Sequence, residues 1–169
     1  MDIIKNNPFR ILGILVGTST KEEHSKIKKL KMLVEAGQEV PEDFSFPIIG
    51  NVNREIQNLE NVISKLNLNK DRVTASLFWF YNGNSETDIP VFEAMKSSIE
   101  EYKETVKIWT SLVANNEITQ ENASAFQNVS TLRLINVFGL YGQHNFKKLE
   151  SGILLKLKFL ESDFVNDFI

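Results

Sequence analysis

Apolar residues recur along most of this chain at intervals of three and four, the spacing of one face of an α-helix. The clearest stripe consists of Ile56, Leu59, Ile63 and Leu66. Alternating apolar and polar runs bounded by hairpin dipeptides, which indicate paired strands, do not occur in the sequence. The pattern therefore predicts an all-α fold with at least six helices.

Capping residues predict where the first helices begin. Asn7 is followed by Pro8, so a short helix is expected there, because the amide caps the first turn and proline fits its first position. Thr20 and Glu23 fit a capping box, which predicts a second helix over residues 20–36.

Two apolar segments follow with different patterns. Prolines and a glycine interrupt residues 38–51, which predicts a loop with Phe44, Phe46 and Ile48 tucked inward. Residues 70–81 are apolar on every side, which predicts a helix that is buried between the two halves of the molecule.

The second half of the chain begins at Asp88, a predicted helix cap. We expect a long helix with an apolar stripe from Ile99 to Val113, a helix capped by Thr119, and a last helix that starts at Asn145.

The last six residues, 164–169, continue a helical apolar pattern without a stop signal. Exposed, they would leave an adhesive apolar patch. We therefore expect one of two outcomes: the chain continues into further helices that cover this face, or it self-associates through its last helix.

Composition and missing motifs argue against several classes of function. The 169 residues include 19 Lys and Arg against 22 Asp and Glu, so the net charge of −3 disfavours nucleic acid as a general partner. The absence of Cys excludes disulfides, thiolate metal sites and cysteine nucleophiles, and two distant His argue against a metal site. Phosphate-binding loops and nucleophile elbows are absent. We assign no catalytic, cofactor or metal residues and expect no enzyme.

Targeting signals are not visible in the sequence either. The N-terminus lacks a basic segment followed by a long apolar run, and the longest apolar stretches are too short to span a bilayer. We expect a cytoplasmic protein without a membrane partner.

The first half resembles a J-domain. "NPFRILGI" followed by "TSTKEEHSKIKKLKMLVEAG" resembles the family's opening, a short helix and then a long lysine-bearing helix, and "REIQNLENVISKLNLNKDRVTASLFWF" resembles its third helix and close. The resemblance implies a J-like helical unit over residues 1–84. It also implies a candidate partner-binding face on the lysine-bearing helix, made of Lys26, Lys28, Lys29 and Lys31.

One departure from the family decides the functional interpretation. A working J-domain carries His-Pro-Asp after its second helix, and this tripeptide triggers ATP hydrolysis by a heat-shock chaperone. Residues 37–43 of this chain contain Pro41 and acidic residues but no His, and His24 lies in the preceding helix. The resemblance thus implies a J-like scaffold without the trigger.

The second half is similar to the tetratricopeptide repeat. In "YKETVKIWTSLVANNEITQENASAFQNVSTLRL", Tyr102, Thr105, Trp109 and Leu112 stand at the repeat's aromatic and small positions, and Arg133 replaces an expected aromatic residue. The resemblance implies a repeat-like unit over residues 85–169 that we expect to continue beyond the chain. Such repeats bind proteins on a concave face, so Arg133 joins the candidate partner-binding residues.

These observations predict a J-like helical unit packed on a repeat-like helical array, acting as a non-catalytic, chaperone-adaptor-like protein–protein interaction module. The expected partner is a chaperone or an acidic peptide, and no cofactor is expected. Two alternatives remain: an active co-chaperone that stimulates a heat-shock chaperone ATPase, and an enzyme whose site is not linear in sequence.

Overall fold

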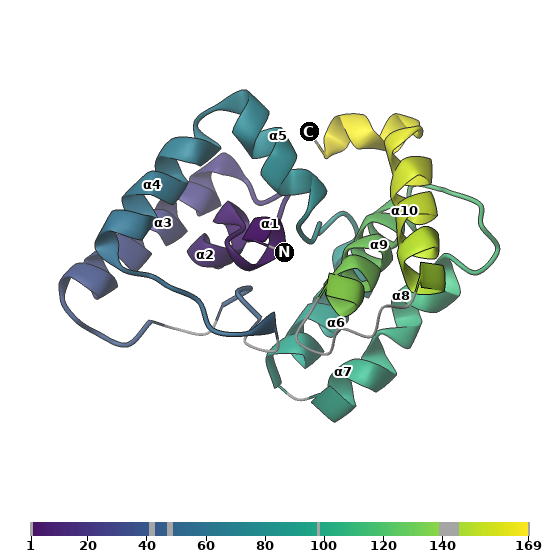
Figure 1. The fold of residues 1–169 in the computed structure, drawn as a ribbon, viewed down its shortest axis with the longest axis horizontal. Coiled ribbons are helices and arrows are strands. Elements are labelled where there is room, and N and C mark those ends of the chain that lie inside the picture. Colours follow the sequence, from purple (N-terminus) through teal and green to yellow (C-terminus); the bar gives the residue numbers. More distant parts are fainter. Residues whose placement is uncertain (1, 41–42, 47–48, 98, 139–145, 169) are drawn as a thin grey trace.

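A computed structural model describes residues 2–40, 43–46, 49–97, 99–138 and 146–168 (Figure 1). In these ranges the regular elements are helices, and the β-type pairing consists of one isolated bridge between Val16 and Tyr81. The all-α prediction is confirmed. The elements are α1 (Asp2–Lys5), α2 (Pro8–Leu12), α3 (Thr20–Glu35), α4 (Ile56–Leu66), α5 (Asn69–Leu77), α6 (Ser85–Ser97), α7 (Ile99–Thr105), α8 (Lys107–Leu112), α9 (Ala123–Phe138), α10 (Phe146–Leu160) and the 3-10 helix η2 (Asp163–Asp167).

The start of α2 is the one predicted. The Asn7 side chain accepts a hydrogen bond of 3.0 Å from the backbone N–H of Phe9, and Pro8 occupies the first helical position. Because proline has no N–H to leave unpaired and its φ is already helical, this pair defines where the helix begins.

The start of α3 differs from the predicted capping box. Ser19, not Thr20, is the cap, and its hydroxyl accepts a hydrogen bond of 3.3 Å from the N–H of Glu22. Glu23 pairs with Arg72 of α5 instead of reaching back to the helix start. Glu23 is thus held by a residue of a different helix, and the spacing of neighbouring residues does not predict this contact.

Helix α4 coincides with the predicted stripe and lies beside α3 (Figure 1). Leu59 and Leu66 of α4 are buried, as is Leu30 of α3. The apolar face of α4 also packs on α2, so these helices share one core because each must bury its apolar side against another.

The helix expected over residues 70–81 is shorter than predicted. α5 ends at Leu77, where the N–H groups of Phe78 and Trp79 donate to the carbonyls of Ala75 and Ser76 and close its last turn. Residues 78–82, called here the 78–82 segment, lie outside the helices, between α5 and α6. The helix buried on nearly every side is instead α9, where every residue from Ala123 to Leu132 is buried. An apolar run alone does not distinguish a buried helix from a buried extended segment.

One edge of the 78–82 segment pairs with the chain that follows α2. The N–H of Val16 donates to the carbonyl of Phe80 at 2.9 Å, and the N–H of Asn82 donates to the carbonyl of Val16 at 3.3 Å. The indole N–H of Trp79 donates to the carbonyl of Ile14 at 2.9 Å. These bonds attach the segment to the first half of the molecule.

Side chains of α9 bind the other edge of the same segment. The Asn128 amide accepts from the N–H of Tyr81 and donates to its carbonyl, both at 2.8 Å. The Gln127 amide donates to the carbonyl of Trp79 at 2.9 Å. A helix thus supplies through its side chains the hydrogen bonds that a neighbouring strand would supply, which satisfies the buried backbone.

Aromatic side chains fill the core around this segment. Phe46 is fully buried, as predicted for the loop, and its ring lies 5.9 Å from Trp79 and 5.3 Å from Phe80. The Phe80 ring also lies 6.2 Å from that of Trp109 in α8. Rings from both halves of the chain therefore form one continuous core. Phe44 is half-buried, and Ile48 lies outside the described residues.

The helices of the second half divide differently from the prediction. The long helix expected from Ile99 to Val113 forms two helices, α7 and α8, separated at Val106. The helix expected after Thr119 begins at Ala123, and Asn145 lies outside the described residues. The predicted apolar stripe from Ile99 to Val113 was correct at its end, where Trp109 and Val113 are buried.

Asp88 caps the start of α6 from inside its first turn. One carboxylate oxygen accepts from the N–H groups of Gly83 at 3.1 Å and Asn84 at 2.9 Å, and the other accepts from the indole of Trp109 at 2.7 Å. Burial raises the pKa of Asp88, while these hydrogen bonds oppose the rise. Asp88 therefore joins α6 to α8.

The apolar residues at the end of the chain are partly covered by the protein. η2 turns residues 164–168 back onto the protein, and the Phe168 ring packs 5.2 Å from Tyr81 and 5.1 Å from Phe159. Phe164 and Val165 are half-buried. The chain end is thus less exposed than a continued helix would leave it, because η2 folds it back, and Ile169 lies outside the described residues. Continuation of the chain and self-association stay predictions.

We predict that Trp79→Ala lowers the free energy of unfolding by about 3–5 kcal/mol, since it removes a fully buried aromatic side chain. Phe78→Ala is the matched control. Phe78 is half-buried, so its loss should cost only about 1 kcal/mol. Denaturant titration of both variants measures the difference, and equal losses would contradict the placement of the segment.

Candidate functional site

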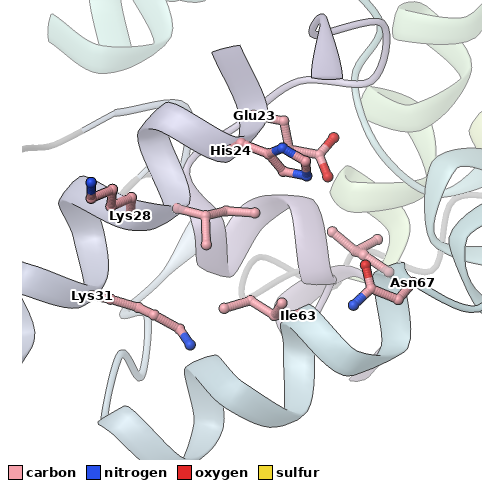
Figure 2. Close-up of a pocket in the computed structure, with 8 residues that line it drawn as sticks. Glu23, His24, Lys28, Lys31, Ile63 and Asn67 are labelled. Atoms are coloured by element: carbon pink, nitrogen blue, oxygen red, sulfur yellow. The ribbon is translucent and has the colours of Figure 1, made fainter. Parts of the chain in front are cut away.

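A groove of about 330 Å³ lies between α3 and α4 (Figure 2). Ile27, Ile63 and Leu66 contribute apolar side chains to its lining. Polar side chains from the two helices complete the lining: Glu23, His24, Lys28 and Lys31 of α3, and Asn67 just after α4. We call this feature the α3–α4 groove.

The groove brings together two of the predicted partner-binding lysines. Lys28 and Lys31 are three residues apart on α3, and both line the groove. Figure 2 shows the Lys31 side chain directed toward Ile63 of α4, while the end of the Lys28 side chain points away from it. Lys29 is exposed but does not line the groove. The sequence identified the correct helix, and the tertiary structure decided which lysines line the groove.

Lys26 belongs to a different environment. Its ammonium lies 4.9 Å from the centre of the Phe44 ring, and Lys96 of α6 lies 4.2 Å from the same ring. Lys26 also pairs with Glu22 at 3.6 Å. Cations near an aromatic ring are attracted by its π-electrons, so Lys26 and Lys96 connect the loop of Phe44 to α3 and α6.

Arg133 lies on α9, where α10 packs against it. It is half-buried, and burial lowers the pKa of its guanidinium from the usual value. The five predicted partner-binding residues therefore do not share one surface. Arg133 belongs to the α9–α10 contact, because the repeat-like alignment compared positions in sequence and not the faces of the helices.

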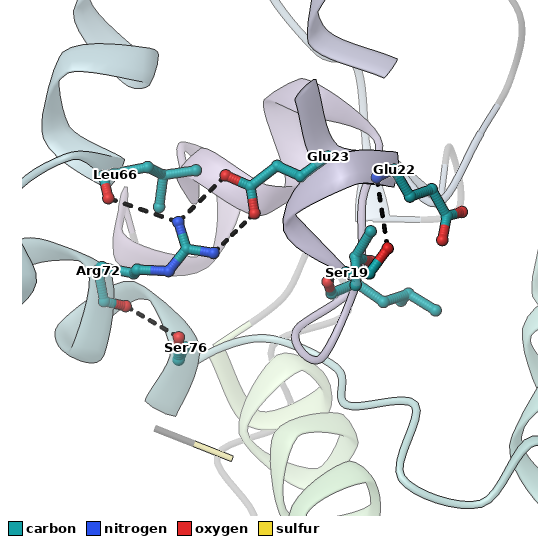
Figure 3. Close-up of polar contacts among 8 residues, drawn as sticks. Ser19, Glu22, Glu23, Leu66, Arg72 and Ser76 are labelled. Carbon is teal, nitrogen blue, oxygen red and sulfur yellow. Dashed lines mark hydrogen bonds and ion pairs between the residues drawn. The ribbon is translucent and has the colours of Figure 1, made fainter. Parts of the chain in front are cut away.

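Glu23, which lines the α3–α4 groove, forms an ion pair with Arg72 of α5 (Figure 3). The Arg72 guanidinium contacts both carboxylate oxygens of Glu23, at 2.6 and 3.1 Å, and lies 5.5 Å from the Phe9 ring centre. The hydrogen bond to Glu23 raises the pKa of Arg72, while burial opposes the rise. This pair neutralises Glu23, so Lys28 and Lys31 give the groove a positive character.

The groove suits a ligand with both apolar and acidic groups. Its apolar lining gains free energy by covering apolar surface, and its two lysines attract carboxylates at its rim. Among the described residues, no cluster of three or more His, Cys, Asp and Glu side chains is placed to hold a metal ion. The described helices include none long and apolar enough to cross a membrane.

Sequence reasoning missed a half-buried lysine on α10 whose ammonium is enclosed. The Lys156 ammonium donates to the carbonyl of Leu77 at 2.7 Å, to the side-chain oxygen of Gln127 at 2.5 Å and to the hydroxyl of Thr131 at 3.2 Å. Burial lowers the pKa of Lys156 to about 7. Lys156 thus connects α10 to the end of α5 and to α9, and its position in an otherwise ordinary helical stripe gave no signal of this.

Comparisons with protein-family models, with curated proteins and with solved structures return no match. The functional argument therefore depends on the geometry described above.

The pKa of Lys156 predicts a pH dependence of stability. Folding moves this pKa from the usual 10.5 to about 7, so between these pH values the unfolded state binds more protons. Stability then rises with pH. We expect the stability difference between wild type and Lys156→Met to shift in favour of wild type by roughly 1 kcal/mol per pH unit from pH 7 to pH 9.

Denaturant titrations at each pH measure this difference. Lys147→Met is the control, because Lys147 is an exposed lysine on the same helix. A difference that does not change with pH would contradict the enclosed position of the Lys156 ammonium.

Proposed function

We propose that this chain is a non-catalytic protein–protein interaction module that binds an acidic, amphipathic segment of a partner protein in the α3–α4 groove. The observation that carries the proposal is the combination of an apolar lining with Lys28 and Lys31 in one groove. A chaperone is the class of partner that the J-like resemblance implies.

The arrangement of the first half supports this proposal. α2, α3, α4 and α5 follow one another as short, long, long and short helices, the order that the resemblance implies. The lysine-bearing α3 is attached to α4 and α5 through the core and the Glu23–Arg72 pair. A preorganised groove binds more tightly than one that must form on binding.

Absence of the His-Pro-Asp trigger supports the non-catalytic part of the proposal. The sequence between α3 and α4 contains no His. The groove therefore offers a partner an attachment point without the tripeptide through which J-domains act on the chaperone ATPase.

A labelled peptide tests the groove. The probe is a fluorescent amphipathic helix with leucines at positions i, i+3 and i+7 and glutamates along both borders, and its binding is measured by fluorescence anisotropy. We expect the double variant Lys28→Glu and Lys31→Glu to weaken binding at least tenfold, about 1.4 kcal/mol. Added salt should weaken wild-type binding, because salt screens exposed charges.

The matched control for this test is the double variant Lys29→Glu and Lys70→Glu. Both side chains are exposed, and neither lines the groove, so the change in net charge is the same. Equal loss in both double variants would indicate nonspecific attraction, and a wild type that does not bind the peptide would refute the groove as a site.

The alternative of an active co-chaperone is tested by ATP hydrolysis. We expect the protein to leave the steady-state ATPase rate of a heat-shock chaperone unchanged, with an authentic J-domain as positive control. A several-fold stimulation that Lys28→Glu abolishes would replace the non-catalytic proposal with the co-chaperone.

A further inference from the structure

The outward face of α10 exposes large apolar side chains. Phe146, Ile153, Leu154 and Leu157 are 78%, 45%, 59% and 48% exposed. They lie on the side of the helix opposite Leu155 and Phe159, which are buried where α10 packs along α9 (Figure 1). A row of exposed apolar side chains along one helix is typical of an interaction surface.

Two pairs of charged residues, on α10 and at the residue directly after it, are placed symmetrically about Leu154, while Lys148 and Lys156 have no charged counterpart. Lys147 stands seven residues before Leu154 and Glu161 seven after it, while Glu150 stands four before and Lys158 four after. At equal distances from Leu154 the charges therefore have opposite signs. If a second copy of the helix lies alongside in the opposite direction, each of these four charges therefore faces a charge of opposite sign.

We propose that the outward face of α10 binds a second copy of the same face, with the two helices antiparallel and a two-fold axis at Leu154. Such a pair places Lys147 opposite Glu161 of the second copy and Glu150 opposite Lys158 of the second copy. Leu154 then meets its own equivalent at the centre. A two-fold interface uses the same patch on both subunits, as this arrangement requires.

A parallel pair in register is disfavoured by the same charges. It would place Glu150 against Glu150 and Lys147 against Lys147, and like charges opposite each other repel. The charge pattern thus selects one orientation of the second copy, and the apolar row supplies the contact area.

Lys158 has contacts within its own chain as well. Its ammonium donates to the backbone carbonyl of Asn116 and lies 5.9 Å from the centre of the Phe126 ring. An ammonium has three N–H donors, so Lys158 keeps donors for Glu150 of the second copy. The outer pair uses Lys147 and Glu161, both exposed, and is the better pair to test.

The size of the face indicates a weak dimer. α10 has 15 residues, a length of about 22 Å at 1.5 Å per residue. A single helix pair of this length lies at the small end of specific interfaces. Association is therefore expected to depend on concentration.

Sedimentation equilibrium of the full chain from about 10 μM to about 1 mM measures this association. We expect wild type to dimerise and Leu154→Glu to raise the dimer dissociation constant at least tenfold, because two glutamates would meet at the two-fold axis. Leu68→Glu is the matched control, since Leu68 is 57% exposed outside α10, and it should leave the dissociation constant unchanged.

Charge reversal tests the antiparallel orientation. Lys147→Glu and Glu161→Lys should each weaken the dimer, and the double variant should restore it. An equimolar mixture of the two single variants should also associate, because each would supply the charge that the other needs. Far-UV circular dichroism verifies that every variant keeps its helix content.

Three results would overturn the proposal. They are a wild type that stays monomeric at 1 mM, the highest concentration of the titration, association that Leu154→Glu leaves unchanged, and failure of the double variant to restore binding. Binding of the acidic peptide in the α3–α4 groove should be unaffected by these α10 variants, so failure here is distinguishable from failure of the proposed function.

Discussion

The rest of the structure depends on how the backbone of the 78–82 segment is hydrogen-bonded. Buried backbone N–H and C=O groups need partners, and Trp79 and Phe80 of this segment are fully buried in an aromatic core. Val16 binds one edge, and the amides of Gln127 and Asn128 bind the other. Replacing an amide of α9 by an apolar side chain would leave those groups buried without partners, which costs more than the hydrogen bond itself contributes.

This arrangement has consequences on both sides of the segment. Toward the N-terminus it holds the end of α5, and Arg72 of α5 in turn pairs with Glu23, which lines the α3–α4 groove. Toward the C-terminus it holds α9, on which α10 packs, and Lys156 of α10 returns to the carbonyl that ends α5. The buried face of α10 is thereby committed to the core, which leaves Leu154 and its neighbours facing outward.

The two proposed surfaces differ in the free energy that would drive binding. The α3–α4 groove combines apolar contact with positive charge, so its binding should depend on the acidity of the ligand and on salt. The outward face of α10 carries both signs in a self-matching order, so charge there selects orientation while apolar contact provides affinity. Figure 1 shows α3 and α4 on one side of the molecule and α10 on the other, an arrangement that leaves each surface accessible when the other is occupied.

The sequence by itself determined the features that depend on near neighbours. The period of three and four predicted an all-α fold, Asn7 and Pro8 predicted the start of α2, and the stripe of α4 was correct in its bounds. The lysine-bearing helix was also identified, since the spacing of lysines can be read directly from the sequence.

Tertiary structure alone decided that α5 ends at Leu77, that α9 is the buried helix, and that Lys28 and Lys31 share a groove while Arg133 does not. Those outcomes depend on hydrogen bonds and ion pairs between residues about 50 positions apart, such as Gln127 with Trp79 and Arg72 with Glu23, and a periodic pattern carries no information about which distant side chain will satisfy a buried polar group.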